Sequence, residues 1–210
     1  MNITLIGAGN MGAGFVKQLT QAGHQVRVTA RHLEKAQALA DAHAGATATP
    51  ADQVLGDSQV VIVATAFADA VPALKALGSL DGRIVIDITN PLTADFMGLT
   101  LGHETSAAEE IAKALPGVPV VKAFNTLLAQ VLAEGPTFAG GQTAPVFYAG
   151  DDERAKQTVR ALAESMGFEP VDAGGLKNAR YLEPLAGLNI YFAYGAGHGT
   201  QIAPTWIRRA

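Results

Sequence analysis

The chain has 210 residues, of which 49% are hydrophobic and only 16% are charged, so it can bury a sizeable core in one domain or in one domain with a modest extension. Its net charge of −4 at pH 7 leaves no basic footprint, and we therefore expect no nucleic-acid partner. The absence of cysteine excludes disulfides, thiolate metal sites and thiol nucleophiles, and it fits a reducing cytoplasm.

Two further features of the sequence concern the cellular location of the chain. No signal peptide is recognisable ahead of the first apolar run, which starts close to Met1. The longest apolar stretch, around residues 185–197, is too short and too rich in glycine to span a bilayer. We expect a cytoplasmic chain that has no membrane partner.

Short apolar runs alternate with longer Ala-rich and Leu-rich segments along the chain. The expected strands cover residues 3–6, 25–29, 60–64, 84–88, 118–123, 146–149 and 170–172. The expected helices cover residues 10–22, 33–43, 68–77, 105–114 and 152–166, and an apolar helix with a short tail follows from about residue 177. Continuous apolar strands between helices are typical of parallel strands covered on both faces. The sequence therefore predicts an α/β fold with a Rossmann-type, doubly wound, mostly parallel sheet.

The first predicted strand leads directly into a glycine-rich turn. Gly7, Gly9 and Gly12 give the spacing G-x-G-x-x-G, and a predicted helix follows at once. In such a motif the glycines allow a tight turn, a close approach of the backbone to a pyrophosphate, and close helix–strand packing. The N-terminus of the helix adds free N–H groups and a partial positive charge. A purely structural turn is the alternative, but the strand–turn–helix context favours a dinucleotide site.

The end of the second predicted strand indicates which dinucleotide binds. NAD-binding domains place an Asp or Glu near this point to hold the ribose 2′-hydroxyl. In this chain the corresponding positions are Thr29, Ala30, Arg31 and His32, with Lys35 one turn later. Arg31 could grip a phosphate with two donors, and Thr29 could add a hydroxyl. An ordinary solvated loop of mixed charge is the alternative, and NADP(H) is the favoured cofactor.

Several segments together resemble a known family. They are "LIGAGNMG", "VTARHLEKA", "SAAEEIAKALPGVPVVKAFNT", "MGFEPVDAGG" and "AYGAGHGT". Over nearly the whole chain they resemble the NADPH-dependent deazaflavin (coenzyme F-420) reductases, also called F-420:NADP oxidoreductases. The same segments are similar to the cytosolic reductase domain of the six-transmembrane metalloreductases, above all "VVKAFNT". The resemblance implies a homodimer and a Rossmann domain, here residues 1–145, with a small C-terminal α/β extension and helix packed on it, here residues 146–210.

The resemblance also implies three groups of cofactor-binding residues. The pyrophosphate would lie against Gly7, Gly9, Asn10, Met11 and Gly12. Arg31 and Lys35 would hold the 2′-phosphate, and His32 would lie near the adenine. The nicotinamide side would be lined by residues that follow three later strands, namely Ala64, Thr65, Ala66, Phe67, Asn90, Pro91, Ala123, Phe124 and Asn125. Archaeal members carry His-Thr near Phe124–Asn125, whereas this chain has the metalloreductase form, and this difference leaves the acceptor open.

No catalytic acid or base is evident in the sequence. Reduction of a carbonyl or an imine needs a proton donor beside the hydride. The 3-hydroxyacid dehydrogenases place a Lys and an Asn one turn apart, whereas Lys177 and Asn178 are adjacent and cannot face one site together. Hydride transfer between two stacked rings needs mainly positioning and exclusion of water. The catalytic residues are therefore left unassigned.

Histidines and C-terminal aromatic residues are the other candidates for contact with ligands or partners. His24 is expected in a turn and His43 at a solvated helix end, whereas His103 and His198 could touch an acceptor. No H-x-x-x-H pattern or carboxylate cluster supplies a metal cage, so we expect no metal site. A subunit interface, rather than stacking on a ring, is favoured for the aromatic residues of the C-terminal helix and tail, Tyr181, Tyr191, Phe192, Tyr194 and Trp206.

We interpret the chain as an NADP(H)-dependent oxidoreductase. It would exchange hydride between NADPH and a small-molecule acceptor, either the deazaflavin F-420 or a flavin (FMN or FAD). A flavin-linked ferric reductase is an alternative that "KAFNT" favours. A non-catalytic NADP-binding sensor is a third reading, because the acid–base pair is missing.

Overall fold

The computed structural model describes residues 1–207 and residue 209, and it confirms the α/β fold. One sheet contains the strands β1 (Asn2–Ile6), β2 (Gln25–Thr29), β3 (Ala46–Ala48), β4 (Val60–Val63), β5 (Ile84–Asp87), β6 (Val120–Ala123), β7 (Pro145–Gly150) and β8 (Glu169–Asp172). Across the sheet the strands are ordered β3-β2-β1-β4-β5-β6-β7-β8. All neighbouring strands run parallel except β6 and β7, so the prediction of a mostly parallel sheet is confirmed.

Helices connect these strands and cover the sheet. The described part of the chain contains α1 (Asn10–Gln21), α2 (Leu33–Asp41), α3 (Phe67–Lys75), α4 (Ala107–Ala114), α5 (Ala129–Glu134), α6 (Glu153–Ser165) and α7 (Ala179–Ile190). Three short turns complete it, η1 (Ala139–Gly141), η2 (Leu176–Asn178) and the π-helical turn η3 (Tyr191–Gly195). Side chains cap two of the helices, because Ser106 accepts the Glu109 N–H at the start of α4 and Asp152 accepts the Ala155 N–H at the start of α6.

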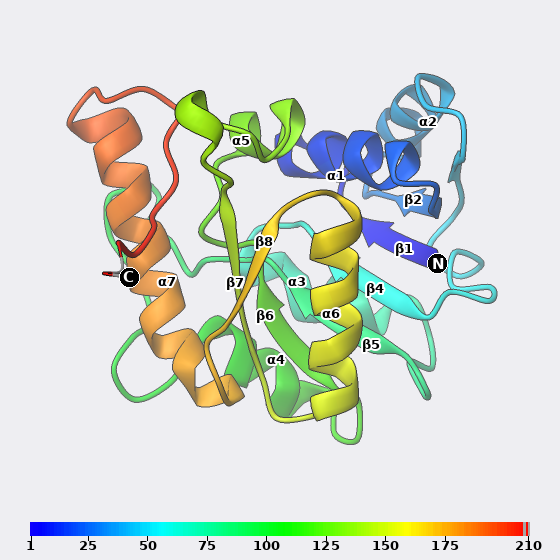
Figure 1. Cartoon of the computed structure of the whole chain (residues 1–210). Coiled ribbons are helices and arrows are strands. Elements are labelled where there is room, and N and C mark those ends of the chain that lie inside the picture. The colour runs from blue at the N-terminus through cyan, green and yellow to red at the C-terminus, as the bar shows by residue number, and fades with distance from the viewer. Residues whose placement is uncertain (208, 210) are drawn as a thin grey trace.

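Different helices cover the two faces of the sheet, as in a doubly wound fold (Figure 1). On one face Phe15 of α1, Leu132 of α5 and Leu162 of α6 pack into one core with the strands. On the other face Leu74 of α3 and Ile111 of α4 belong to a second core. The central strands are therefore buried on both sides, which explains their continuous apolar sequences.

The two elements that the sequence did not indicate are short. Strand β3 has three residues, pairs only with β2 at the edge of the sheet, and reads Ala-Thr-Ala, which carries little strand signal. Helix α5 has six residues and follows β6 closely. Both are held by packing on longer neighbours rather than by a periodic pattern of their own.

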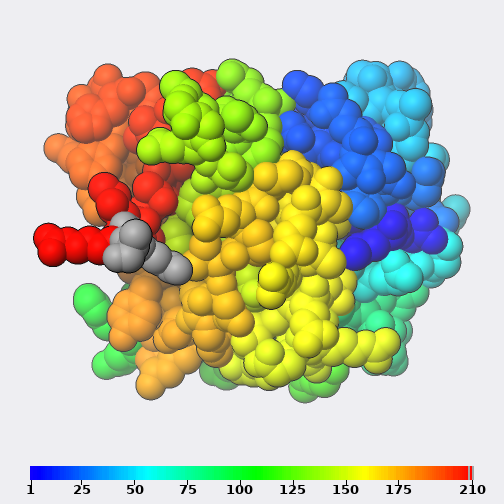
Figure 2. All heavy atoms as spheres, in the orientation of Figure 1, coloured from blue at the N-terminus to red at the C-terminus, as the bar shows by residue number. Residues whose placement is uncertain are grey.

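The last part of the chain continues the same sheet. Strand β7 pairs with β6, β8 pairs with β7, and α7 lies at that end of the molecule (Figure 1). Figure 2 shows α7 and the C-terminal segment, orange to red, at the opposite end of the surface from β1 and α1, in blue. The division at residue 145 stays a prediction. No helix among the described residues is long and apolar enough to cross a membrane.

Candidate functional site

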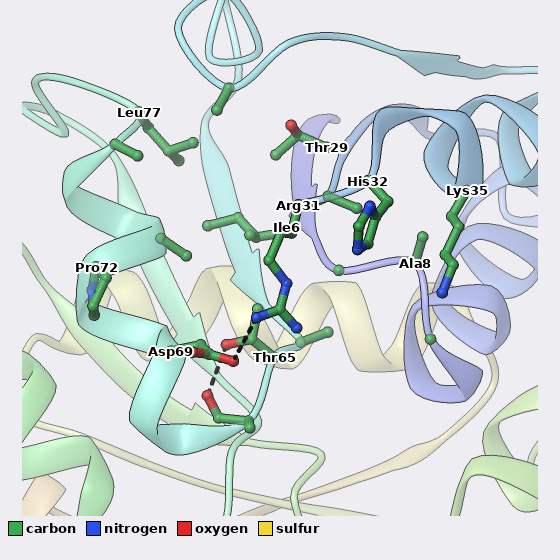
Figure 3. Close-up of a pocket in the computed structure, with 18 residues that line it drawn as sticks. Ile6, Ala8, Thr29, Arg31, His32, Lys35, Thr65, Asp69, Pro72 and Leu77 are labelled. Atoms are coloured by element: carbon green, nitrogen blue, oxygen red, sulfur yellow. Dashed lines mark hydrogen bonds and ion pairs between the residues drawn. The ribbon is translucent and has the colours of Figure 1, made fainter.

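A crevice opens at the carboxyl ends of β1, β2 and β4, where the order of the strands reverses. It has a volume of about 520 Å³. Ligands of doubly wound sheets bind at this point of the fold. We call it the Arg31 crevice, and Figure 3 shows Arg31, His32 and Lys35 on one side of it and Asp69 and Pro72 of α3 on the other.

The glycine-rich turn forms one wall of the Arg31 crevice. Gly7 has a φ of 117°, and a Cβ atom there would strike the carbonyl group of Ala64. A Cβ atom on Gly12 would strike the carbonyl group of Gly7. A Cβ atom on Gly9, by contrast, would meet no protein atom within 4 Å. The turn is closed against the protein and open toward the crevice, which is the shape that a pyrophosphate group needs to approach the backbone.

The start of α1 follows this turn directly. Gly9 is its N-cap residue, no side chain caps the helix, and its first turn contains no acidic residue. The first N–H groups of the helix are therefore available to an anion, and the helix dipole favours negative charge at this end. This end of α1 fits the pyrophosphate of a dinucleotide.

Three side chains that can carry a positive charge follow β2. Arg31 and His32 connect β2 to α2, and Lys35 lies in the first turn of α2. Thr29, the last residue of β2, is buried and also lines the crevice. A phosphate bound here would meet up to three cationic groups, and arginine offers it two parallel donors. The side chains present therefore fit the 2′-phosphate that distinguishes NADP from NAD.

A second crevice, with a volume of about 560 Å³, lies against the start of α1. It is lined by Asn10 and Met11 from α1, by Asn90 from the loop after β5, and by Asn125 from the loop after β6. We call it the Asn90 crevice. Because Gly9 lines the Arg31 crevice and Asn10 lines this one, the two crevices meet at the start of α1.

Two asparagines hold the inner wall of the Asn90 crevice in place. Nδ2 of Asn125 donates to Oδ1 of Asn90 at 2.9 Å, and Nδ2 of Asn90 donates to the Asn125 carbonyl oxygen at 3.0 Å. Nδ2 of Asn125 also donates to the carbonyl oxygen of Leu182 in α7 at 3.0 Å. These bonds connect two strand ends and α7 at a single point.

Aromatic and apolar side chains form the outer rim of the Asn90 crevice. Phe96 and Met97 come from the loop after β5, and Tyr194 comes from η3. Phe96 is exposed and has a φ of 62°, which is a strained backbone conformation for a bulky residue. Strained residues and π-helical turns are frequent at functional sites. The rim offers flat apolar surfaces to a ligand.

Among the described residues that line the Asn90 crevice, Asp95 and Tyr194 are the titratable ones. A hydrogen bond from the Thr93 hydroxyl, and a second from the Met97 N–H, lower the pKa of Asp95. Asp95 is therefore ionised at neutral pH and cannot supply a proton. The phenol of Tyr194, which is exposed on the rim, is the one group of this lining that could do so.

The residues expected on the nicotinamide side are divided between the two crevices. Ala64, Thr65 and Ala66 line the Arg31 crevice, and Phe67 begins α3 without lining either crevice. They follow β4, which is adjacent to β1, whereas the Asn90 crevice lies at the ends of β5 and β6. The assignment of these residues to the nicotinamide side stays a prediction, and the structure places the first three at the Arg31 crevice, which meets the Asn90 crevice at the start of α1.

Three further positions from that group do not present their side chains to either crevice, and their role in cofactor binding stays a prediction. Pro91 lines neither crevice. Ala123 and Phe124 are fully buried, so their side chains face the core. Phe124 packs edge-to-face on Phe15 with ring centroids 5.2 Å apart. A strand end carries side chains of both faces, and only Asn125 of this segment turns toward the opening.

A buried ion cluster near the Asn90 crevice was missed at the level of sequence. Nζ of Lys122 in β6 lies 2.6 Å from the carboxylate of Asp87 in β5, 2.8 Å from that of Glu183 in α7, and 2.6 Å from the Thr89 carbonyl oxygen. All three charged side chains are almost completely buried. The carboxylate of Glu183 also accepts the first two N–H groups of α4. The only signal in the sequence was a charged residue inside each of two apolar strands.

Four of the five histidines line neither of the two crevices, whereas His32 lines the Arg31 crevice. His24 follows the turn before β2 and is buried, with Nδ1 2.9 Å from the Met1 amine and Nε2 2.9 Å from Oγ of Ser165. Burial, and the positive amine beside it, lower the pKa of His24. His103 and His198 line neither crevice. No group of three or more potential metal ligands occurs among the described residues.

The fold, the glycine turn and the basic rim define a dinucleotide-binding domain of Rossmann type. Residues 2–91 match the family model described as "NADP oxidoreductase coenzyme F420-dependent". This stretch runs from β1 to the loop after β5 and includes all the residues that line the Arg31 crevice.

Known proteins extend the similarity over most of the chain. The F420-dependent NADP reductase of Methanothermobacter marburgensis is 28% identical over 210 residues, covering 90% of this chain and 91% of that protein. The metalloreductase STEAP3 of Rattus norvegicus is 32% identical over 184 residues, which cover 87% of this chain but only 36% of that longer protein. A solved structure from Arthrobacter sp. FB24, described as a candidate F420-dependent NADP reductase, matches with a TM-score of 0.87 at 28% identity and covers 98% of this chain and 99% of its own. These matches confirm the resemblance to both groups and support an NADP-dependent oxidoreductase.

Proposed function

We propose that the chain is an NADP(H)-dependent oxidoreductase whose acceptor is a flat ring, a deazaflavin or a flavin, held in the Asn90 crevice. NADPH would supply the hydride from its nicotinamide ring. Arg31 and Lys35 hold the 2′-phosphate, the start of α1 holds the pyrophosphate, and Asn10 and Met11 direct the remaining part of the cofactor into the Asn90 crevice.

The observation that carries this proposal is the lining of the Asn90 crevice. It combines an aromatic and apolar rim with asparagine amides, and its one carboxylate, Asp95, is held in the ionised form. Hydride transfer between two stacked rings needs alignment and exclusion of water, and it needs no strong acid. Such a lining suits a ring acceptor better than a small carbonyl compound.

The residues of this crevice have separate tasks in the proposed reaction. Asn90 and Asn125 fix the inner wall through their paired amides. Phe96 and Tyr194 on the rim would contact the acceptor and exclude water from the transfer. Alignment of two reacting partners can supply several kcal/mol of the barrier, on the order of 7–11 in favourable cases.

Two acceptors follow from the relatives. Similarity to an F420-dependent NADP reductase over nine-tenths of both chains favours a deazaflavin. Similarity to a metalloreductase favours a flavin that passes electrons on to a ferric ion, which would be the substrate. This chain covers 91% of the F420-dependent NADP reductase but only 36% of the metalloreductase, so we favour the deazaflavin.

Stopped-flow absorbance tests the proposal. NADPH is mixed with the protein and F-420, or with FMN or FAD in the presence and absence of a ferric chelate, and NADH replaces NADPH in parallel runs. We expect rapid bleaching of one ring with NADPH and slow bleaching with NADH. Arg31→Ala should weaken NADPH binding by about tenfold or more, because charged hydrogen bonds to a phosphate are lost. Arg154→Ala, an exposed arginine on α6, is the matched control.

One outcome would contradict the ring acceptor, namely tight binding of NADPH without reduction of any ring. The chain would then be either a sensor or a reductase of a small molecule. In the latter case Tyr194→Phe would abolish turnover of the carbonyl or imine, because the phenol would be the proton donor. For a ring acceptor the same variant keeps the stacking surface and should retain most of the activity.

We also infer that two copies associate through α7 and that the enzyme works in the cytoplasm. Tyr181, Leu188 and Tyr191 are exposed on α7 and at its end, which is unusual for large apolar side chains unless a partner covers them. The absence of cysteine is in keeping with a reducing compartment. Leu188→Asp should shift the sedimentation coefficient from dimer to monomer, and a parent chain that is monomeric at all concentrations would contradict the association.

A further inference from the structure

Asp69 is the carboxylate of the Arg31 crevice. Among the described residues that line this crevice no other side chain carries a negative charge, whereas Arg31, His32 and Lys35 can carry a positive one. Asp69 lies in the first turn of α3, on the wall opposite Arg31 (Figure 3). Its Oδ2 is 3.9 Å from Nη1 of Arg31, so this ion pair reaches from one wall of the crevice to the other.

The ion pair uses the group that a 2′-phosphate needs. The guanidinium of Arg31 is a planar fork that binds a phosphate through two parallel donors. While Nη1 of Arg31 faces Asp69 on α3, this nitrogen is not available to a phosphate beside Lys35, on the same side of the crevice as Arg31. Binding of a 2′-phosphate through two parallel donors therefore requires Arg31 to turn away from Asp69. NAD(H), which lacks the phosphate, can leave the pair in place.

We propose that Asp69 tunes the choice between NADP(H) and NAD(H) by holding Arg31 whenever no 2′-phosphate is bound. The inference rests on the proposed function for the identity of the cofactor. Asp69 is a positioning residue that acts through Arg31. It lowers the affinity for NADP(H), leaves the affinity for NAD(H) unchanged, and so narrows the preference for the phosphorylated cofactor.

The size of the effect follows from the exposure of the pair. The side chains of Arg31 and Asp69 are 81% and 55% exposed, so solvent screens their attraction. Exposed ion pairs of this kind change an equilibrium constant by about fivefold at most. We expect Asp69→Asn to tighten NADPH binding by about two- to fivefold. The gain should shrink as salt is added, since screening weakens the pair in the parent chain.

A double-mutant cycle in the full chain provides the test. The dissociation constants of NADPH and NADH are measured by fluorescence titration at low ionic strength for the parent, Asp69→Asn, Arg31→Ala and the double variant. Asp69→Glu keeps the charge and should bind like the parent. Glu34→Gln is the matched control, because Glu34 is a carboxylate 3.4 Å from His32 that does not line the crevice.

The expected result is a gain in NADPH affinity for Asp69→Asn that disappears when Arg31 is alanine. A gain that persists without Arg31 would mean that Asp69 repels the phosphate directly, and it would overturn the proposal. The proposal would also be overturned by an equal gain in NADPH affinity in Glu34→Gln, or by an unchanged NADPH affinity in Asp69→Asn. Weaker NADH binding in Asp69→Asn would identify a ribose ligand and also overturn it. If the parent chain fails to bind NADPH, the proposed function itself fails, which is a separate result.

Discussion

Gly9 and Gly12 lie in the same turn but have opposite surroundings. A Cβ atom on Gly9 would meet no protein atom within 4 Å, whereas one on Gly12 would strike the Gly7 carbonyl group. We therefore expect Gly9→Ala to change the free energy of unfolding by about 1 kcal/mol or less, and to weaken NADPH binding by about tenfold or more, because the methyl group occupies the space of the pyrophosphate. Gly12→Ala should lower the free energy of unfolding by about 1–3 kcal/mol.

Urea unfolding and NADPH titration separate these two effects. Gly23→Ala cannot serve as a control because Gly23 has a positive φ, but Gly102 has open space around it and an ordinary φ. Gly102→Ala should change neither quantity. Normal NADPH binding by Gly9→Ala would contradict the assignment of the pyrophosphate to this turn.

Single residues were predictable from the sequence where a local pattern determines their position. Gly7, Gly9 and Arg31 follow two adjacent strands, so they had to meet at one edge of the sheet. Asp69 faces Arg31 only because α3 begins on the opposite wall, and no local pattern marks such a contact. The sequence predicts a turn at His24 but not its burial, nor its contact with Ser165, whose Oγ lies 2.9 Å from Nε2 of His24.

At the scale of elements, long periodic segments were predictable and short ones were not. Helices α1 and α6 span 12 and 13 residues and carry enough apolar periodicity to be recognised. Strand β3 and helix α5 have three and six residues, too few to show a period. The conformations of β3 and α5 depend on packing against β2 and α1, which are not adjacent to them in sequence.

Helices α4 and α7 are connected by an ion pair that should make the stability depend on acid. Arg180 of α7 donates from Nε and Nη2 to the two carboxylate oxygens of Glu109 in α4, at 2.8 and 2.7 Å. The Arg180 guanidinium is the main cause of the lowered pKa of Glu109. A lowered folded-state pKa adds stability above the ordinary glutamate pKa of about 4.3, and this stability is lost as the pH falls through the folded-state value.

We expect Arg180→Met to lower the free energy of unfolding at pH 7 by about 1 kcal/mol. The difference from the parent chain should shrink below pH about 4.3, where Glu109 becomes protonated in the unfolded chain, and vanish once it is protonated in both states. Urea unfolding of the parent and the variant from pH 7 to pH 3 measures this difference in the free energy of unfolding. Arg160→Met is the control, because Arg160 pairs with Glu164 on the surface of one helix and its loss should change little. A difference that stays constant with pH would show that Arg180 acts through packing alone.

At the scale of the whole molecule, one sheet and one ion cluster join the two parts of the chain. Strand β7 pairs with β6, so the sheet continues across residue 145. Lys122 and Asp87 come from the first part of the chain and Glu183 from the second, and the three meet in the interior. The family resemblance implied a Rossmann domain with an extension packed on it, but sequence patterns describe segments only in chain order. They carry no information on which buried charges must be neutralised by a distant segment.

This continuity predicts that residues 1–145 do not form a stable domain alone. The fragment would leave β6 as an open edge and Lys122 without Glu183, and loss of one partner from a buried pair costs about 3–5 kcal/mol. That is a large share of a typical net stability of about 5–15 kcal/mol. We expect non-cooperative unfolding of the fragment by far-UV circular dichroism and no NADPH binding.

Two further proteins serve as controls for the fragment. A chain of residues 1–199 keeps α7 and should unfold cooperatively. Glu183→Gln in the full chain should reproduce part of the loss in the free energy of unfolding. Cooperative unfolding of residues 1–145 with NADPH bound would instead establish an independent dinucleotide-binding domain.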